Sequence, residues 1–225
     1  RESDWSSDVC SSDLLVAATG IPSPSEGVWY LGPLPLRAYG IIIAIGMVVG
    51  VWWTARRYVA RGGSSDTIYD VALWAIPLGV VGARLYHVVT SPEAYFGPGG
   101  DPMLAFQIWR GGLGIWGGVA LGALGAYVGV KRAKVRFGPI ADSLAPALLV
   151  AQGIGRWGNW FNQELFGGPT TLPWGLQIDA AHVPAGYPVG TLFHPTFLYE
   201  SLWDLAGAAL IVALERRRRF AAGQL

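Results

Sequence analysis

The stretch from residue 155 to residue 164 holds the densest group of chemically capable side chains in the sequence. It reads Gly-Arg-Trp-Gly-Asn-Trp-Phe-Asn-Gln-Glu and places Arg156, Asn159, Asn162 and Glu164 between large aromatic residues. The planar fork of an arginine suits the oxygens of a phosphate, amides bond hydroxyl and carbonyl oxygens, and a glutamate can orient the arginine or accept a proton. Tryptophans alone would indicate anchoring at a membrane interface, but the four polar residues favour a binding site for an oxyanion.

A second group, Arg84 with Tyr86 and His87, lies within one helical turn near the end of an apolar run. An ionisable side chain inside a membrane span is costly, so its presence needs a reason. Two interpretations of Arg84 stay open. Its side chain extends along its own span to the lipid headgroups, or it faces the interior of a helix bundle and binds a phosphate that enters from the outer leaflet.

A third group begins at Arg110, where glycines precede the next apolar run. Free backbone N–H groups and the positive end of the helix dipole bind anions at a helix start. Arg110, Gly112 and Gly114 are therefore candidate anion ligands. Small residues continue at every fourth position from Gly114 to Ala126, a pattern that predicts close packing of this helix against a neighbour.

The last apolar run opens with His-Pro-Thr-Phe-Leu-Tyr-Glu, from His194 to Glu200. His194 can help to cap this helix, because a proline suits its first turn. Glu200 would lie within the membrane, where carboxylates are usually paired, and its expected partner is Arg84 or Arg156. The three histidines are far apart and no metal, nucleotide or hydrolase motif occurs, so neither a metal nor a cofactor is predicted.

Membrane helices must position these residues, because the chain is too apolar for an ordinary soluble domain. Of its 225 residues, 52% are hydrophobic and 14% are charged, against roughly 25% charged residues in soluble domains. Such a composition also excludes a disordered chain, and a single cysteine excludes a disulfide scaffold. Five runs approach the roughly 20 residues that cross a bilayer; they cover residues 36–54, 68–89, 113–130, 140–154 and 197–214. The prediction is an all-α integral membrane protein, a polytopic helix bundle with a small external head segment.

The distribution of basic residues predicts how the bundle is oriented. Most of the 16 lysines and arginines follow the first, third and fifth runs, at residues 56–61, 131–136 and 216–219. Basic loops face the cytoplasm, so the N-terminus is expected outside and the basic C-terminal end inside.

The expected organisation along the chain follows from these spans. Residues 1–14, with Cys10, are unlike the rest and lack the form of a signal peptide, so they are interpreted as a non-native addition. Residues 15–35 form an external segment, 36–155 the first four helices, 156–195 the head segment, 196–215 the fifth helix and 216–225 a cytoplasmic end. A connection as long as the head segment is usually functional.

Five segments of the chain resemble the sequence signatures of the prolipoprotein diacylglyceryl transferase family, in the same order and spacing. They are residues 82–86, 110–118, 155–168, 172–175 and 194–200, and residues 35–40 resemble the motif of the family's first span. The resemblance covers roughly residue 31 to the end, and the Gly-Arg-x-Gly-Asn block at residues 155–159 is its most specific part.

This resemblance implies a bacterial inner-membrane enzyme with seven helices and an external head. Such enzymes move the diacylglyceryl group of phosphatidylglycerol onto the lipobox cysteine thiol of a prolipoprotein, which is the first step of lipoprotein maturation, and they release glycerol phosphate. The implied partners are phosphatidylglycerol, the prolipoprotein signal peptide and the lipid bilayer, and not a nucleic acid. Seven family helices against five spans here imply two further spans beyond the basic end, so the chain is expected to be incomplete.

By matching motifs, Arg156 and Asn159 are expected to be essential donors, Glu164 their organiser and Tyr39 a tyrosine of the site. The residues expected to bind phosphatidylglycerol are Arg156, Arg84, Arg110, Gly112, Gly114, Asn162, His194 and Glu200. Many family members have a histidine where this chain has Trp116. Tryptophan cannot act as a base, so the proton acceptor for the thiol is left open.

Two other classes of protein are alternatives to the transferase. A transporter or flippase for an anionic solute or lipid would also use intramembrane charges and glycine-interrupted helices, but it tends to show internal repeats and a site at the bilayer midplane. No repeat occurs here, and the polar residues gather at the outer ends of the spans. A structural membrane subunit would leave the Arg-Asn-Asn-Glu group without a purpose.

Overall fold

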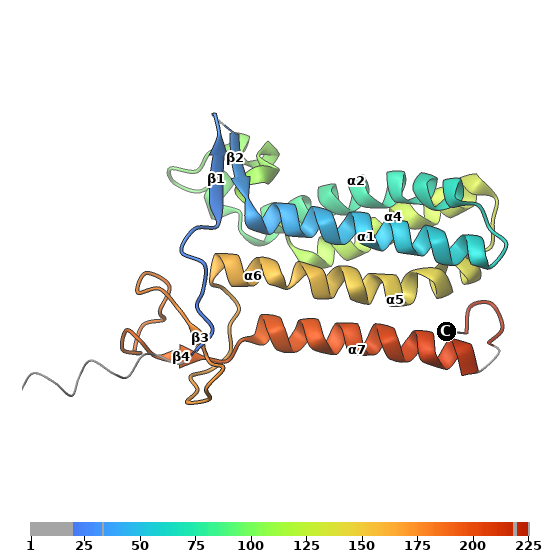
Figure 1. The fold of residues 1–225 in the computed structure, drawn as a ribbon. Helices are drawn as coiled ribbons and strands as arrows, with labels where there is room; N and C mark the ends of the chain where they lie inside the picture. The colour runs from blue at the N-terminus through green and yellow to red at the C-terminus, as the bar shows by residue number, and fades with distance from the viewer. Residues whose placement is uncertain (1–19, 33, 218–219, 225) are drawn as a thin grey trace, which may run out of the picture. The chain divides into compact units, whose positions relative to one another are not determined.

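The computed structural model of this protein describes residues 20–32, 34–217 and 220–224. The expected non-native addition at residues 1–14, with Cys10, lies outside the described residues. The helices are α1 (Ala38–Ala60), α2 (Ser65–Thr90), α3 (Glu93–Phe96), α4 (Ile115–Ala133), α5 (Phe137–Gly155), α6 (Trp157–Asn162) and α7 (Thr196–Arg217), with two short 3-10 helices, η1 (Pro102–Phe106) and η2 (Ile108–Arg110) (Figure 1).

Four helical stretches are long and apolar enough to cross a membrane: Ala38–Ala60, Ser65–Thr90, Phe137–Asn162 and Thr196–Arg217. The protein is therefore an all-α, multi-pass membrane protein, as its composition predicted. The expected span at residues 113–130 is present as helix α4, although α4 is not among those four stretches.

The described residues form two compact units. The first contains residues 20–32, 34–42 and 153–203. Two small antiparallel sheets stabilise it: β1 (Val28–Leu31) pairs with β2 (Leu34–Arg37), and β3 (Leu176–Gln177) pairs with β4 (Leu192–Phe193). Its apolar core is built from Leu176, Ile178, Phe193 and Phe197. The core gives the long connection between α6 and α7 a fixed structure, because its strands pack on the first turn of α7.

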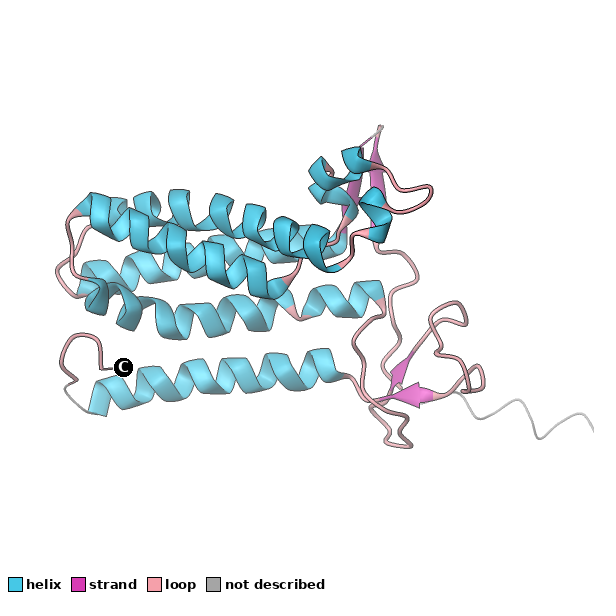
Figure 2. Ribbon diagram, turned by 180° about the vertical axis from the view of Figure 1, so that it is seen from behind, coloured by secondary structure: helices cyan, strands magenta, loops and turns pink. Residues whose placement is uncertain are grey.

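The second unit contains residues 43–152, 204–217 and 220–224, and its helices lie side by side (Figure 2). The closest contact is between α2 and α4, at Gly82 and Gly117. A Cβ added to either glycine would lie less than 3.0 Å from the carbonyl oxygen of the other. The predicted small-residue pattern is confirmed here, because the Gly122 backbone lies against the Gly79 backbone of α2. Only glycines permit two helix backbones to approach so closely.

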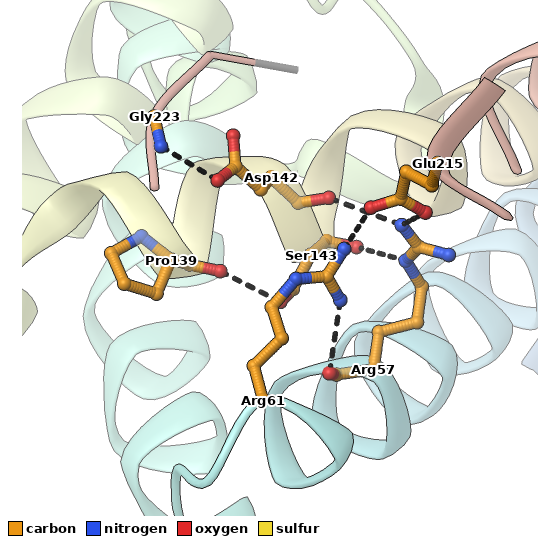
Figure 3. Close-up of polar contacts among 7 residues, drawn as sticks. All are labelled: Arg57, Arg61, Pro139, Asp142, Ser143, Glu215 and Gly223. Carbon is orange, nitrogen blue, oxygen red and sulfur yellow. Dashed lines mark hydrogen bonds and ion pairs between the residues drawn. The ribbon is translucent and has the colours of Figure 1, made fainter. Parts of the chain in front are cut away.

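An ionic cluster ties α1, α5 and α7 together at one end of this unit (Figure 3). Arg57 pairs with Glu215 at 2.5 Å and also donates to the carbonyl oxygens of Ser143 at 3.1 Å and Asp142 at 3.3 Å. Arg61 pairs with the second carboxylate oxygen of Glu215. Both arginines come from the basic stretch that was predicted to face the cytoplasm, and one carboxylate of α7 joins them.

Candidate functional site

The candidate site is built around Arg156, at the break between two helices of the first unit. Helix α5 ends at Gly155 and α6 begins at Trp157, so Arg156 lies at their junction with near-helical backbone angles. Helix α6 is short because Gln163 adopts the left-handed conformation, with φ of 50°. A short turn therefore carries all four polar side chains that the sequence singled out.

Helix α7 provides the counter-charge of this arginine. The Nε atom of Arg156 forms an ion pair with the Oε2 atom of Glu200. Arg156 was one of the two partners expected for Glu200, so that alternative is confirmed. The Arg156 and Glu200 side chains are 31% and 45% exposed, so both can be reached from outside the protein. Because the pair engages Nε, it leaves both terminal amino groups of the guanidinium outside the pair.

Tyr39, Asn159 and Glu164 are placed in the same unit as Arg156. Tyr39 interacts electrostatically with Glu164 and with Arg156, and its ring lies on Gly158, where a Cβ would be 2.5 Å from the Tyr39 Cδ2 atom. Asn159 is buried, and its carbonyl oxygen accepts the backbone N–H of Glu164 at 3.1 Å. The four residues expected to be catalytic are thus brought together by α6 and the first turn of α1.

Side-chain hydrogen bonds hold two of the expected lipid-binding residues of the first unit, and one of them, Asn162, is bonded to this group. Asn162 donates to the Glu164 carboxylate at 3.0 Å. The His194 ring nitrogen Nδ1 lies 3.2 Å from the hydroxyl of Tyr199, which also accepts the indole N–H of Trp174 at 2.9 Å. Sequence reasoning did not single out Tyr199 or Trp174. Their one signal was the position of Tyr199 beside Glu200, and of Trp174 within a family-like segment.

Aromatic packing fixes α6 against the start of α7. Trp160 stacks on Phe197, with ring centroids 5.8 Å apart and an interplanar angle of 17°. Trp157 donates its indole N–H to the Ser201 hydroxyl at 3.1 Å and packs edge-on against Phe197. The tryptophans that resembled membrane anchors therefore hold the two helices that carry Arg156 and Glu200.

A buried glutamine supports the other side of the α6 turn. Gln163 is 4% exposed and donates its amide N–H groups to the carbonyl oxygen of Pro24 at 3.1 Å and to the Asp179 carboxylate at 2.5 Å. In return, its Oε1 atom accepts the backbone N–H of Asp179 at 2.7 Å. Three separate segments of the first unit meet at this side chain, and the sequence alone gave no sign of it.

The remaining expected site residues, Arg84, Arg110, Gly112 and Gly114, belong to the second unit. Arg84 is 7% exposed and donates to backbone carbonyl oxygens of the connection between α3 and α4. Arg110 is exposed at the end of η2. Gly112 accepts an Arg84 hydrogen bond through its carbonyl oxygen, and Gly114 lies on the ring of Tyr86.

Comparison with known proteins shows the family of the chain. Residues 26–225 match the family described as prolipoprotein diacylglyceryl transferase. The chain is similar to phosphatidylglycerol–prolipoprotein diacylglyceryl transferase 2 of Streptomyces coelicolor, with 58% identity over 88% of this chain and 62% of the relative. It is 53% identical to the enzyme of that name from Paenarthrobacter aurescens over 94% of this chain and 70% of the relative. With the Rhodococcus jostii enzyme, identity is 49% over 91% of this chain and 60% of the relative.

The chain thus spans about 60 to 70% of the length of these relatives. The family match includes α6, both small sheets and every membrane-spanning helix. On this evidence the chain belongs to the prolipoprotein diacylglyceryl transferase family.

Proposed function

We propose that the protein transfers the diacylglyceryl group of phosphatidylglycerol to the lipobox cysteine thiol of a prolipoprotein. The observation that carries this proposal is the Arg156–Glu200 ion pair at the junction of α5 and α6, in a chain of this family. It presents a guanidinium at the end of a membrane-spanning stretch, Phe137–Asn162. A phospholipid places its phosphate at that depth, because the headgroup borders the hydrocarbon layer.

Arg156 would bind the phosphate through the amino groups that the ion pair leaves outside it. Glu200 would then hold the guanidinium in position through Nε, as a positioning residue. Paired charge-assisted hydrogen bonds from a fixed fork are stronger and more directional than those of a point charge. Such a fork stabilises the negative charge that collects on the phosphate as it leaves.

The transfer forms one bond and breaks another at the glyceryl carbon that carries the phosphate. The cysteine thiol loses its proton to solvent or to Glu164, the exposed carboxylate that also interacts with Tyr39. The sulfur attacks the carbon, a thioether forms, and the electron pair of the broken C–O bond leaves with glycerol phosphate. The thiolate is the effective nucleophile, so a nearby acceptor for its proton favours the reaction.

Asn159, Asn162 and His194 are proposed to contact the glycerol part of the lipid. Asn162 is exposed and is held by Glu164 at 3.0 Å. His194 is partly exposed and is held by Tyr199. Amide and imidazole groups that are held in place can bond hydroxyl oxygens at low entropic cost.

The proposed location is the bacterial inner membrane, with the N-terminus outside and Arg216 and Arg217 in the cytoplasm. The basic ends of α1, α4 and α7 support this orientation, because positive residues are retained on the cytoplasmic side. The first unit, with Arg156, would then face the outer leaflet, where secreted prolipoproteins arrive.

The test uses proteoliposomes that contain the protein and phosphatidylglycerol with labelled acyl chains. A peptide that carries a lipobox cysteine is the acceptor, and the same peptide with serine in place of cysteine is the control. The expected result is label on the cysteine peptide alone, with one glycerol phosphate released for each lipid transferred.

The same assay separates the transferase from the transporter. Movement of labelled lipid between leaflets without label on the cysteine would contradict the proposal and favour a flippase. Label on both peptides would also contradict it, because a thioether requires the thiol.

A further inference from the structure

The Arg84 side chain binds the backbone of the connection between α3 and α4. Its guanidinium donates from Nε to the carbonyl oxygen of Ala105 at 3.0 Å and from Nη2 to that of Leu104. Its Nη1 atom donates to Gly111 at 2.6 Å and to Gly112 at 2.9 Å. A guanidinium has five N–H donors. Four of those of Arg84 thus form hydrogen bonds to main-chain oxygens of one segment, residues 104–112.

Neighbouring side chains keep this guanidinium in place. The Arg84 guanidinium lies over the ring of Tyr95, 5.3 Å from its centroid. The Tyr95 hydroxyl is 2.8 Å from His87 Nδ1, and Tyr95 is 3% exposed. Stacking on an aromatic face and burial both favour a single arginine conformation.

The same contact explains one of the two neighbouring glycines of the segment, Gly112. Gly112 has φ of 72°, and a Cβ there would lie 2.7 Å from Arg84 Nη1 and 2.9 Å from the His87 ring. Gly111 has φ of 89°, but a Cβ on it would meet no atom of the described residues within 4 Å. The chain therefore needs a glycine at residue 112 both for its backbone angles and for the approach of Arg84.

Large apolar side chains of residues 102–116, a stretch that includes this segment, point away from the protein. Phe106, Ile115 and Trp116 are 74%, 72% and 70% exposed, and Met103 and Trp109 are also exposed. So many exposed apolar side chains in one short segment mark a surface that contacts an apolar partner.

The main chain of this segment has the hydrogen bonds that an apolar partner would require. The backbone N–H groups of Leu104, Gln107, Arg110 and Gly111 each bond to a carbonyl oxygen three residues earlier. The N–H of Gly114 bonds to the carbonyl oxygen of Ala83 at 2.8 Å. Arg84 bonds to three further carbonyl oxygens, and also to that of Leu104, which accepts the Gln107 N–H as well. Irregular backbone can lie near the hydrocarbon layer only when its polar groups are satisfied in this way.

We propose that residues 102–116 lie in the membrane interface as a lipid-contacting segment, and that Arg84 is the positioning residue that holds its apolar side chains toward the lipid. The partner is the lipid surface, because the segment continues from the end of α2, a membrane-spanning helix. Tryptophans such as Trp109 and Trp116 favour that depth. This assigns Arg84 to the protein's own backbone, in place of the phosphate-binding role that its sequence position suggested.

The first experiment measures the depth of the segment. Phe106→Cys, in a background with Cys10→Ser, is labelled with an environment-sensitive fluorophore in vesicles of phosphatidylcholine and phosphatidylglycerol. Some of the lipids carry a spin label close to the headgroup. We expect these lipids to quench the fluorophore at least twofold and aqueous iodide to have little effect. Ala185→Cys, at an exposed position of the polar head segment, is the matched control that iodide should quench.

Both alternative occupants of this surface give different results. Quenching of the Phe106→Cys label by iodide but not by lipid would mean that the segment faces water. Quenching by neither agent would mean that protein, such as a second copy of the chain, covers it. Each result would overturn the proposal.

The second experiment tests the positioning role of Arg84. Arg84→Lys keeps the charge but cannot reach four carbonyl oxygens, so lipid quenching at residue 106 should fall and trypsin should cleave after Arg110 several-fold faster. Gly112→Ala should act in the same direction, and more strongly than Gly111→Ala, which shares the backbone strain but not the contact with Arg84.

Neither readout depends on the transfer reaction, so this proposal and the proposed function fail independently. An Arg84→Lys protein with unchanged quenching and proteolysis, but weaker binding of phosphatidylglycerol, would show that Arg84 binds phosphate and would overturn the positioning role. Equal effects of Gly112→Ala and Gly111→Ala would also contradict it.

Discussion

At the scale of single residues, the arrangement of Arg156 explains why the site needs an arginine. Its Nε atom is used by Glu200, and only a side chain with further donors can pair there and still bind a phosphate. Lysine has one charged nitrogen, which cannot bind the carboxylate and the phosphate in the same two-sided way as a guanidinium. The proposed chemistry therefore depends on the shape of the guanidinium as well as on its charge.

Arg156→Lys should lower transfer activity strongly while the protein still inserts and folds. Loss of one hydrogen bond to a charged group costs about 1.5–3 kcal/mol, which corresponds to roughly a 10- to 150-fold decrease in kcat/KM at about 1.4 kcal/mol per decade. The measurement is initial rate in proteoliposomes, with thermal melting as the control for folding. A rate within twofold of the unchanged protein would show that charge alone is enough.

Glu200→Gln should impair the reaction through Arg156. The amide cannot form the ion pair, so the guanidinium loses its fixed orientation, and kcat should fall more than KM rises because positioning acts mainly in the transition state. Glu26→Gln, at an exposed glutamate of the same unit, is the matched control and should leave both constants unchanged. In a double-mutant cycle, Arg156→Lys and Glu200→Gln should be non-additive; additive effects would contradict the coupling.

At the scale of elements, the contact between α2 and α4 depends on glycines at matched positions. Each of Gly82 and Gly117 faces the carbonyl oxygen of the other. A single added methyl group would force the two backbones apart, and packed helices tolerate such overfilling poorly. The start of α4, which continues from the Arg84-bound segment, is held by the same contact.

Gly82→Ala should destabilise the protein by about 1–3 kcal/mol, as overpacking does in other cores. Gly40→Ala is the matched control. Gly40 also lies in a helix, but a Cβ there would meet no atom within 4 Å in the part of the chain that the structure describes. Alanine is about 1 kcal/mol better than glycine inside a helix, so the control should be neutral or stabilising. The measurement is thermal melting in detergent, and equal melting temperatures for the two variants would contradict the contact.

The helices were predictable from the sequence, because apolar runs of spanning length have few alternatives in a membrane. The residues at which the helices end were less predictable. The first run was expected to end at residue 54, but α1 continues to Ala60, since basic residues such as Arg56 and Arg57 are favourable at a helix C-terminus. A prediction based on hydropathy stops at these charges, whereas the helical hydrogen bonds do not.

The candidate site was predictable in part. Arg156, Asn159, Asn162 and Glu164 are close together in sequence, so one short turn had to bring them together. The oxygens that Arg84 binds were not predictable, because they are main-chain atoms of an irregular segment and any residue type supplies them. The contact between Trp174 and Tyr199 likewise depends on the path of a loop, which hydrophobic periodicity does not describe.

At the scale of the whole molecule, the cluster around Glu215 joins helices from distant parts of the chain (Figure 3). Its members differ in burial: the Arg57 side chain is 11% exposed and that of Arg61 is 27% exposed. Arg57 also bonds to two carbonyl oxygens of α5. The more buried arginine, with more partners, should therefore contribute more to stability.

Glu215→Gln should lower the stability of the protein by about 1–3 kcal/mol, because it leaves a partly buried guanidinium without its counter-charge. Arg57→Gln should be at least as harmful, and Arg61→Gln clearly milder, since a more exposed pair contributes little. Thermal melting of the three variants gives the comparison. A larger effect at Arg61 than at Arg57 would contradict the order set by burial.

The orientation of the chain in the membrane depends on whether α4 spans it. Helix α4 packs antiparallel along α2, from Gly117 against Gly82 near one end to Gly129 against Val71 near the other. With 19 residues it is roughly 28 Å long at 1.5 Å per residue, close to the hydrocarbon thickness of about 30 Å. Since α2 is a membrane-spanning helix, α4 should span as well.

Only if α4 crosses do the basic ends of α1, α4 and α7 share one side of the membrane, as the retention of positive residues requires. Single cysteines at Ser65→Cys and Phe137→Cys, the first residues of α2 and α5, should then react with an impermeant maleimide in inside-out vesicles. Ala185→Cys should react in right-side-out vesicles. Reaction of Phe137→Cys from the side opposite to Ser65→Cys would mean that α4 does not cross, and the basic residues after α4 would then face outward.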